Sequence, residues 1–224
     1  MGAIEIAEIV ENYRSVLDRI HNAAVRSKRD PKSIKLISVT KTVSVERIRQ
    51  AVECGAHDFG ENRLQEALEK LNELRGPGLT WHFIGHIQTN KAKKVAETFD
   101  WIHSVDRIEL ADKLGRTAAK ALSVLIEVKL HEEPNKSGVA VPELAELIAV
   151  VRRYDLLHLR GLMAVPPFLE NSEDVRPYFR RLRELARQYG LEELSMGMTH
   201  DFEVAIEEGS TMVRVGTGLF GKRG

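Results

Sequence analysis

A buried β-strand that ends on a lysine is predicted by the stretch Ile34-Lys35-Leu36-Ile37-Ser38-Val39-Thr40-Lys41-Thr42. Its centre is apolar and partly β-branched, and the turn signal Asp30-Pro31 precedes it. Ser44 occupies the position of a helix N-cap, ahead of a periodic apolar run. Lys41 is therefore predicted at the carboxyl end of a strand, facing the loop into the next helix. In α/β folds, that edge of the sheet is where ligands bind.

Two interpretations of Lys41 are open at this point. In partly desolvated surroundings the pKa of a lysine falls, so that its neutral amine can attack an aldehyde and form a Schiff base. Alternatively, Lys41 is a solvated lysine whose charged end extends into water from the strand end, as most lysines do.

The amino-acid composition is that of an ordinary globular protein, and its balanced charge does not indicate a nucleic-acid or membrane partner. The chain has 224 residues, 43% of them hydrophobic and 29% charged, and its 33 basic residues balance its 33 acidic ones. This balance gives no support to a nucleic-acid or membrane partner. Glu5, Glu8 and Glu11 interrupt the N-terminal apolar residues, which argues against a signal peptide. The single cysteine, Cys54, cannot form an intrachain disulfide, so we expect a cytoplasmic protein.

Strands and helices alternate along the whole chain. An amphipathic helix comes first, and eight strands are then predicted, at 34–41, 56–60, 79–84, 101–105, 122–130, 157–163, a segment ending at 194–195, and 211–215. Such alternation predicts a parallel sheet, either a doubly wound open sheet or a closed barrel. The first strand-to-helix turn lacks the Gly-x-Gly-x-x-Gly of a dinucleotide site, and eight is the strand number of a barrel. We therefore expect a single (β/α)8 TIM barrel domain over residues 1–224, with an extra N-terminal helix.

In a barrel the carboxyl ends of the strands converge on one mouth. The segment 213–218, Val-Arg-Val-Gly-Thr-Gly, predicts a strand that passes through a glycine turn into a short helix. Glycines allow backbone N–H groups to approach an anion, and barrels often hold phosphate in the loops after their seventh and eighth strands. Ser195, Gly197, Gly216 and Thr217 fall in this region. Together with Lys41, they predict a site for a phosphorylated aldehyde such as pyridoxal 5′-phosphate (PLP).

Motifs across nearly the whole chain resemble those of the pyridoxal phosphate homeostasis proteins. The matching segments are V-T-K-T at 39–42, F-G-E-N at 59–62, W-H-F-I-G-H-I-Q-T-N-K at 81–91, H-S-V-D at 103–106, K-S-G at 136–138, R-G-L-M-A-V at 160–165, L-S-M-G-M-T-H-D at 194–201 and G-S-T-M-V-R-V-G-T-G-L-F-G at 209–221. That family has one (β/α)8 barrel, similar to the N-terminal domain of alanine racemase.

The resemblance implies a PLP-binding protein of vitamin B6 and amino-acid homeostasis, acting as a carrier and not as an enzyme. It implies that Lys41 holds PLP covalently as an internal aldimine. The other implied cofactor residues are Ser195, Gly216 and Thr217 at the phosphate, Arg214 at the pyridine nitrogen, and Asn62, His82 and Met163 along the pocket. A monomer is expected, and PLP-dependent enzymes lacking their cofactor are the candidate protein partners. Thr199 stands where serine is frequent in the family and keeps a hydroxyl, and the tail 222–224 lacks the usual Asp-Tyr.

Other functions are weighed against this carrier role. A PLP-dependent amino-acid racemase needs a second base, which alanine racemase takes from a tyrosine in a further domain that this sequence does not contain. A phosphate-binding barrel without an aldehyde is a third possibility. His82 and His86 lie on a strand and its loop, without a His-Glu-x-x-His helix, so no metal site is predicted. Glu61 and Asp106 are expected in solvated or capping roles.

Overall fold

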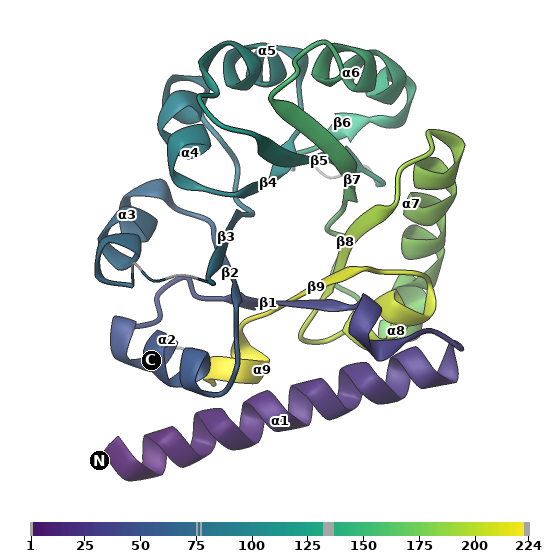
Figure 1. Cartoon of the computed structure of the whole chain (residues 1–224). Helices are drawn as coiled ribbons and strands as arrows, with labels where there is room; N and C mark the ends of the chain where they lie inside the picture. Colours follow the sequence, from purple (N-terminus) through teal and green to yellow (C-terminus); the bar gives the residue numbers. More distant parts are fainter. Residues whose placement is uncertain (1, 75, 77, 132–136, 222–224) are drawn as a thin grey trace.

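Eight parallel strands close into a barrel in the computed structural model, which describes residues 2–74, 76, 78–131 and 137–221 (Figure 1). Each strand pairs with the one before and after it, β4 pairs with β5, and β1 pairs with β9 to close the ring. The barrel strands are β1 (Lys35–Val39), β2 (Asp58–Glu61), β3 (Thr80–Phe83), β4 (Trp101–Val105), β5 (Leu122–Lys129), β7 (Leu157–Met163), β8 (Glu193–Met198) and β9 (Met212–Val215). The predicted (β/α)8 barrel is confirmed, and each of the eight predicted strands is present.

Helices surround the barrel on its outer side, as Figure 1 shows. They are α1 (Gly2–Arg26), α2 (Val45–Glu53), α3 (Leu64–Glu73), α4 (Ala92–Thr98), α5 (Ile108–Thr117), α6 (Leu144–Val151), α7 (Arg176–Gln188), α8 (Phe202–Glu207) and α9 (Thr217–Phe220), with short 3-10 turns η1 (Pro31–Ser33), η2 (Thr89–Lys91), η3 (Val141–Glu143) and η4 (Ser172–Val175). Ser44 caps α2 as predicted, because its side chain accepts a hydrogen bond from the Arg47 N–H.

The predicted N-terminal helix, α1, packs along the outside of the ring against α2, α8 and α9 (Figure 1). The Asn12 amide donates to the carbonyl of Leu219 at 3.1 Å, which joins α1 to α9. Arg19 pairs with Glu203 at 2.6 Å and lies over the Phe202 ring at 4.4 Å from its centroid. These contacts attach the start of the chain to its last two helices.

Alternation along the strands separates the barrel interior from the layer under the helices. Most buried apolar side chains lie in one large cluster, to which both the strands and the helices contribute. Ile37, Leu125, Met163 and Met212 form a second, much smaller cluster, and each comes from a barrel strand. The interior is therefore apolar only in part, and polar side chains fill much of the rest.

Strand β8 differs from the prediction at its carboxyl end. The sequence indicated a strand ending at Leu194-Ser195, whereas β8 continues to Met198. Gly197 makes this continuation possible: its φ is +92°, and a Cβ there would lie 2.6 Å from the Ala205 Cβ. The pairing with β9 shifts register between Ser195 and Met198. Ser195 is thus inside the barrel, and Thr199 is the first residue after the strand.

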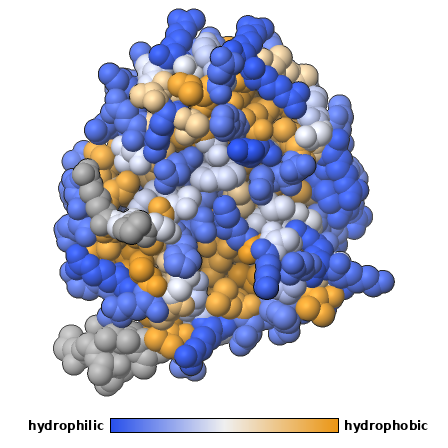
Figure 2. Space-filling model, in the orientation of Figure 1, coloured by the Kyte–Doolittle hydropathy of each residue, from blue (hydrophilic) through white to orange (hydrophobic). Residues whose placement is uncertain are grey.

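A two-residue strand, β6 (Val139–Ala140), pairs with the end of β5 and was not predicted. Lys136 of the K-S-G motif and the tail 222–224 lie outside the described residues. On the face seen in Figure 2, side chains fill the centre of the ring, and hydrophilic residues divide the apolar surface into separate patches. Among the described helices, none has the length and apolarity needed to cross a membrane.

Candidate functional site

A cavity of about 280 Å³ lies at the barrel mouth between the ends of β1 and β9. Lys41 and Thr42 line it from the first strand-to-helix turn, and Gly216 and Thr217 line it from the last one. Arg47 of α2 adds a guanidinium, which also donates to the carbonyl of Phe220 at 2.9 Å. One amine, one guanidinium and a glycine turn therefore share a single cavity, as an aldehyde carrying a phosphate would require.

The turn that carries Lys41 is held from behind by two side chains of α3. Lys70 donates to the carbonyl of Thr40 at 2.5 Å, and the Glu66 carboxylate accepts a hydrogen bond from the N–H of Thr42. Thr42 has φ +63°, a left-handed conformation that is rare for a β-branched residue. Because the contacts fall on the residues before and after Lys41, they fix the backbone from which its amine projects.

Lys70 belongs to a buried ion cluster. Its ammonium lies 2.8 Å from Glu61 and 2.5 Å from Glu66, and only 6% of Lys70 and none of Glu61 is exposed. Burial raises the pKa of Glu61, against the hydrogen bonds from Lys70 and Thr40. Glu61, expected in a solvated or capping role, is instead the buried anion that keeps Lys70 in place.

Hydroxyl and amide donors gather at the glycine turn after β9. The Thr217 hydroxyl lies 3.3 Å from the Thr199 hydroxyl, which also accepts from the N–H of Gly218 at 3.4 Å. A Cβ on Gly218 would lie only 3.0 Å from the Thr199 methyl, so this position suits glycine. Of the predicted phosphate residues, Gly216 and Thr217 are at this turn. Thr199 joins them and was not predicted as a ligand, because β8 was expected to end three residues earlier.

Ser195 lies deeper, in contact with Arg214. Arg214 donates to the Ser195 hydroxyl at 2.5 Å, to the Ser195 carbonyl at 2.8 Å and to the Ala164 carbonyl at 3.0 Å. Burial lowers the pKa of Arg214 to about 10, so the guanidinium remains charged at neutral pH. The structure thus brings Ser195 and Arg214 together, but the Ser195 hydroxyl is occupied inside the barrel.

The three predicted pocket residues lie in different surroundings. His82 is fully buried, with hydrogen bonds to Asp58 and His103, and Met163 belongs to the small interior cluster. Asn62 is half-buried beside the carboxyl end of β2, and its side-chain oxygen is buried with no hydrogen-bond partner among the described residues. Their contact with a ligand stays a prediction.

Glu127 is a further titratable group that the sequence interpretation did not single out. It lies two residues beyond Leu125 of the interior cluster, on the same side of β5, and pairs across the sheet with Met163. Burial and the nearby charge of Asp106 raise the pKa of Glu127 to about 7, although Arg214 opposes this shift. Near neutral pH, its carboxyl group therefore exists in both protonation states.

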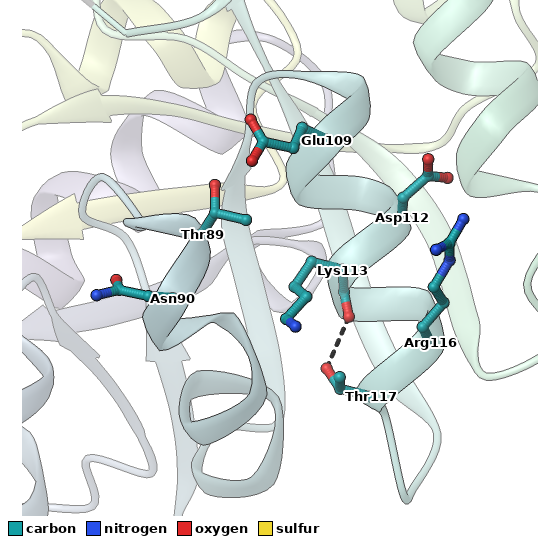
Figure 3. A pocket seen from close by; sticks show the side chains of 7 residues that line it. All are labelled: Thr89, Asn90, Glu109, Asp112, Lys113, Arg116 and Thr117. Carbon is teal, nitrogen blue, oxygen red and sulfur yellow. Dashed lines mark hydrogen bonds between the residues drawn. The ribbon is translucent and has the colours of Figure 1, made fainter.

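A metal site and a pocket outside the barrel are two alternatives to the mouth cavity as the functional site. Within the described part of the chain, no group of three or more His, Cys, Asp or Glu side chains could hold a metal ion. A larger pocket lies outside the barrel between η2 and α5 (Figure 3). Two of its polar side chains already have protein partners: Asp112 accepts from Tyr154 at 2.9 Å, and Thr117 donates to the Lys113 carbonyl at 2.7 Å. The mouth cavity is therefore the candidate site.

Replacing Lys70 tests the support behind Lys41. The Lys70→Met substitution leaves Glu61 buried without its cation, so we expect a loss of about 3 kcal/mol in the free energy of unfolding, measured in urea. In Lys93→Met, which removes an exposed partner of Glu97, the loss is expected to stay under about 0.5 kcal/mol. Equal losses in the two variants would contradict the role assigned to the cluster.

The raised pKa of Glu127 predicts that the stability of the protein depends on pH. Its pKa of about 7 in the folded state lies above the ordinary 4.5, so between these values the folded protein binds more protons than the unfolded chain. Wild-type stability should therefore fall as pH rises through this window, by up to about 3 kcal/mol in total. In Glu127→Gln this contribution should disappear, which denaturation at pH 4.5, 6 and 8 would measure. Parallel curves for the two proteins would show that Glu127 titrates normally.

Several known proteins are similar to this chain in sequence, in fold or in both. Residues 4–224 match the family described as alanine racemase, N-terminal domain. The pyridoxal phosphate homeostasis protein of Aquifex aeolicus is 48% identical over 222 residues, which cover 95% of this chain and 97% of that protein. The structure of PipY from Synechococcus elongatus with PLP bound has 37% identity and a TM-score of 0.81, covering 96% of this chain and 100% of PipY. Alanine racemase from Corynebacterium glutamicum, at 18% identity and a TM-score of 0.70 over 97% of this chain and 62% of the racemase, shares the fold. The chain belongs to the alanine racemase N-terminal domain family and, within it, to the pyridoxal phosphate homeostasis proteins.

Proposed function

We propose that this protein binds PLP covalently at Lys41 and serves PLP and amino-acid homeostasis in the cytoplasm. The observation that carries the proposal is the shared cavity of Lys41, Arg47, Gly216 and Thr217. The Aquifex aeolicus relative named as a pyridoxal phosphate homeostasis protein and the PLP-bound PipY structure support the choice of ligand. PLP supplies an aldehyde that reacts with amines and a ring that can accept electrons.

The donors of the cavity fit a phosphorylated aldehyde. We assign the phosphate to the glycine turn, with Gly216, the hydroxyls of Thr217 and Thr199, and Arg47 as the nearby positive charge. Lys41 would supply the amine that condenses with the aldehyde, with loss of water. Ser195, first assigned to the phosphate, fits better as the residue that orients Arg214, since its hydroxyl is bonded to Arg214 and His103.

A carrier role is favoured over racemisation by two features. Arg214, assigned to the pyridine nitrogen, only donates hydrogen bonds and so keeps that nitrogen unprotonated, which weakens the ring as an electron sink. Racemisation also needs a second base opposite Lys41, and none of the residues lining the described cavity is a tyrosine. Of the described tyrosines, Tyr154 is bonded to Asp112 on the outer surface, and Tyr13 is buried in α1.

The remaining parts of the proposal concern partners. We infer a monomer that delivers PLP to PLP-dependent enzymes lacking their cofactor. Neither a nucleic acid nor a membrane is part of the proposed role. No metal is assigned to it.

Absorbance spectra of the purified protein test the covalent linkage. We expect a yellow absorbance band with PLP, fixed covalently by borohydride, which intact mass and peptide mapping would locate at Lys41. The band should be absent in Lys41→Ala and unchanged in Lys32→Ala, a control in the exposed turn η1. A wild-type protein that gains no band with added PLP would exclude the proposed ligand.

Exchange of the α-proton in deuterated buffer separates a carrier from a racemase. The PLP-loaded protein is expected to exchange the α-protons of L- and D-alanine no faster than free PLP at the same concentration, because the ring is a poor electron sink. NMR follows the loss of the α-proton signal, with Lys41→Ala as the matched control. Rapid exchange that depends on Lys41 would favour the enzyme.

A further inference from the structure

A row of polar side chains crosses the barrel interior behind Arg214. The Ser195 hydroxyl lies 2.5 Å from an Arg214 nitrogen and 2.9 Å from Nδ1 of His103. The opposite nitrogen of His103, Nε2, lies 3.0 Å from Nδ1 of His82, whose own Nε2 lies 2.9 Å from the Asp58 carboxylate. Four hydrogen bonds thus join β9, β8, β4, β3 and β2, from Arg214 to Asp58.

Both ends of this row have a fixed hydrogen-bond role. A guanidinium has only donors, so Arg214 donates and the Ser195 oxygen accepts. A carboxylate has only acceptor oxygens, and Asp58, 3.7 Å from the Lys35 ammonium, is paired as an anion. Asp58 therefore accepts from His82, which places a proton on Nε2 of His82.

The ends then determine the proton positions between them. Burial lowers the pKa of both His82 and His103, so each ring is neutral and carries one N–H. With the His82 proton on Nε2, its Nδ1 must accept, and His103 must donate from its own Nε2. Nδ1 of His103 then accepts the Ser195 hydroxyl proton. With the opposite tautomer of His103, two bare nitrogens would face each other at 3.0 Å, which buried polar groups avoid.

We propose that Asp58, His82 and His103 are positioning residues that hold Ser195 and Arg214 through a one-directional chain of hydrogen bonds. All four bonds donate in the same sense, from Arg214 toward Asp58, so each polarises the next. The packing fixes the rings as well: His82 stacks on Trp101 at 5.7 Å between centroids, and Lys35 lies 4.9 Å from the Trp101 centroid. If Arg214 faces the pyridine nitrogen, which rests on the proposed function, the chain sets the orientation of that donor.

The tautomers are measurable without PLP. Long-range ¹H–¹⁵N correlation spectra of the ligand-free protein should show His82 and His103 each protonated at Nε2 alone, with resonances assigned from His82→Gln and His103→Gln. A proton on Nδ1 of either ring, or a mixture of tautomers, would overturn the proposed chain. This measurement is made on the wild-type fold.

The exchange of the Arg214 side-chain N–H protons with water measures how firmly Arg214 is held in position. In Asp58→Leu and His103→Phe, the side-chain N–H groups of Arg214 should exchange with water about tenfold faster or more, because strong bonds in a charged network are lost. Asp58→Asn keeps an acceptor oxygen and should restore slow exchange. Asp100→Asn also removes a charge near His82 but leaves the chain intact, so it should match wild type. Equal exchange rates in all four variants would show that the row fills space in the interior and does not position Arg214.

Adding PLP to the same proteins separates this inference from the proposed function. Wild-type tautomers as predicted, with no PLP band, would retain the chain and exclude PLP. A PLP band in a protein with mixed tautomers would retain the proposed function and overturn the chain. If both hold, PLP should dissociate about tenfold faster from His103→Phe than from Asp100→Asn.

Discussion

The pairing of β1 with β9 is the constraint on which the candidate site depends. Ile37 lies opposite Arg214 and Ser38 opposite Val215, so the two strands run side by side and leave the sheet at the same edge. Lys41 and the Gly216-Thr217 turn, at opposite ends of the sequence, therefore line one cavity. One ligand in this cavity can therefore contact both ends of the sequence at once. Because the same strand pairing closes the ring, it also encloses the polar residues behind Arg214.

Below the mouth of the barrel, polar side chains occupy part of the buried interior. A barrel interior filled with branched apolar residues would be the simpler core. Among the described residues, the apolar interior cluster instead consists of four buried side chains, with Trp101 and Val165 packed against them. Lys70 of α3 belongs to a buried charged cluster, and a hydrogen-bonded row that includes His82 and His103 crosses the interior. Buried polar groups are costly unless every member has a partner. Their placement next to Lys41 on one side and Arg214 on the other is consistent with a role in orienting these two residues.

The strands, their order and the barrel could be predicted from the sequence because they depend on local periodicity and on the rule that parallel strands need crossovers. Site residues next to strand ends, such as Lys41 and Gly216, followed from the same rule. Thr199 was missed because the strand was expected to end at Leu194-Ser195, whereas β8 continues to Met198 through the positive φ of Gly197. The contacts of Lys70 with Thr40 and of His103 with Ser195 join residues far apart in sequence, and only the folded chain reveals them.

Arg214 connects the interior to the proposed chemistry. A protonated carboxyl group at a pyridine nitrogen could exchange its proton with the ring, but the Arg214 guanidinium, with a pKa of about 10, remains a charged donor at neutral pH. In the proposed chain, the hydrogen bonds behind Arg214 all donate away from it, which leaves Arg214 as a donor at its own end of the row. On the proposed function, the ring nitrogen of PLP can then only accept, and the ring withdraws electrons weakly. Under this proposal, Lys41 keeps the amine needed to hold an aldehyde, whereas the ring beside Arg214 stabilises a carbanion weakly. Both properties suit a carrier of a reactive cofactor.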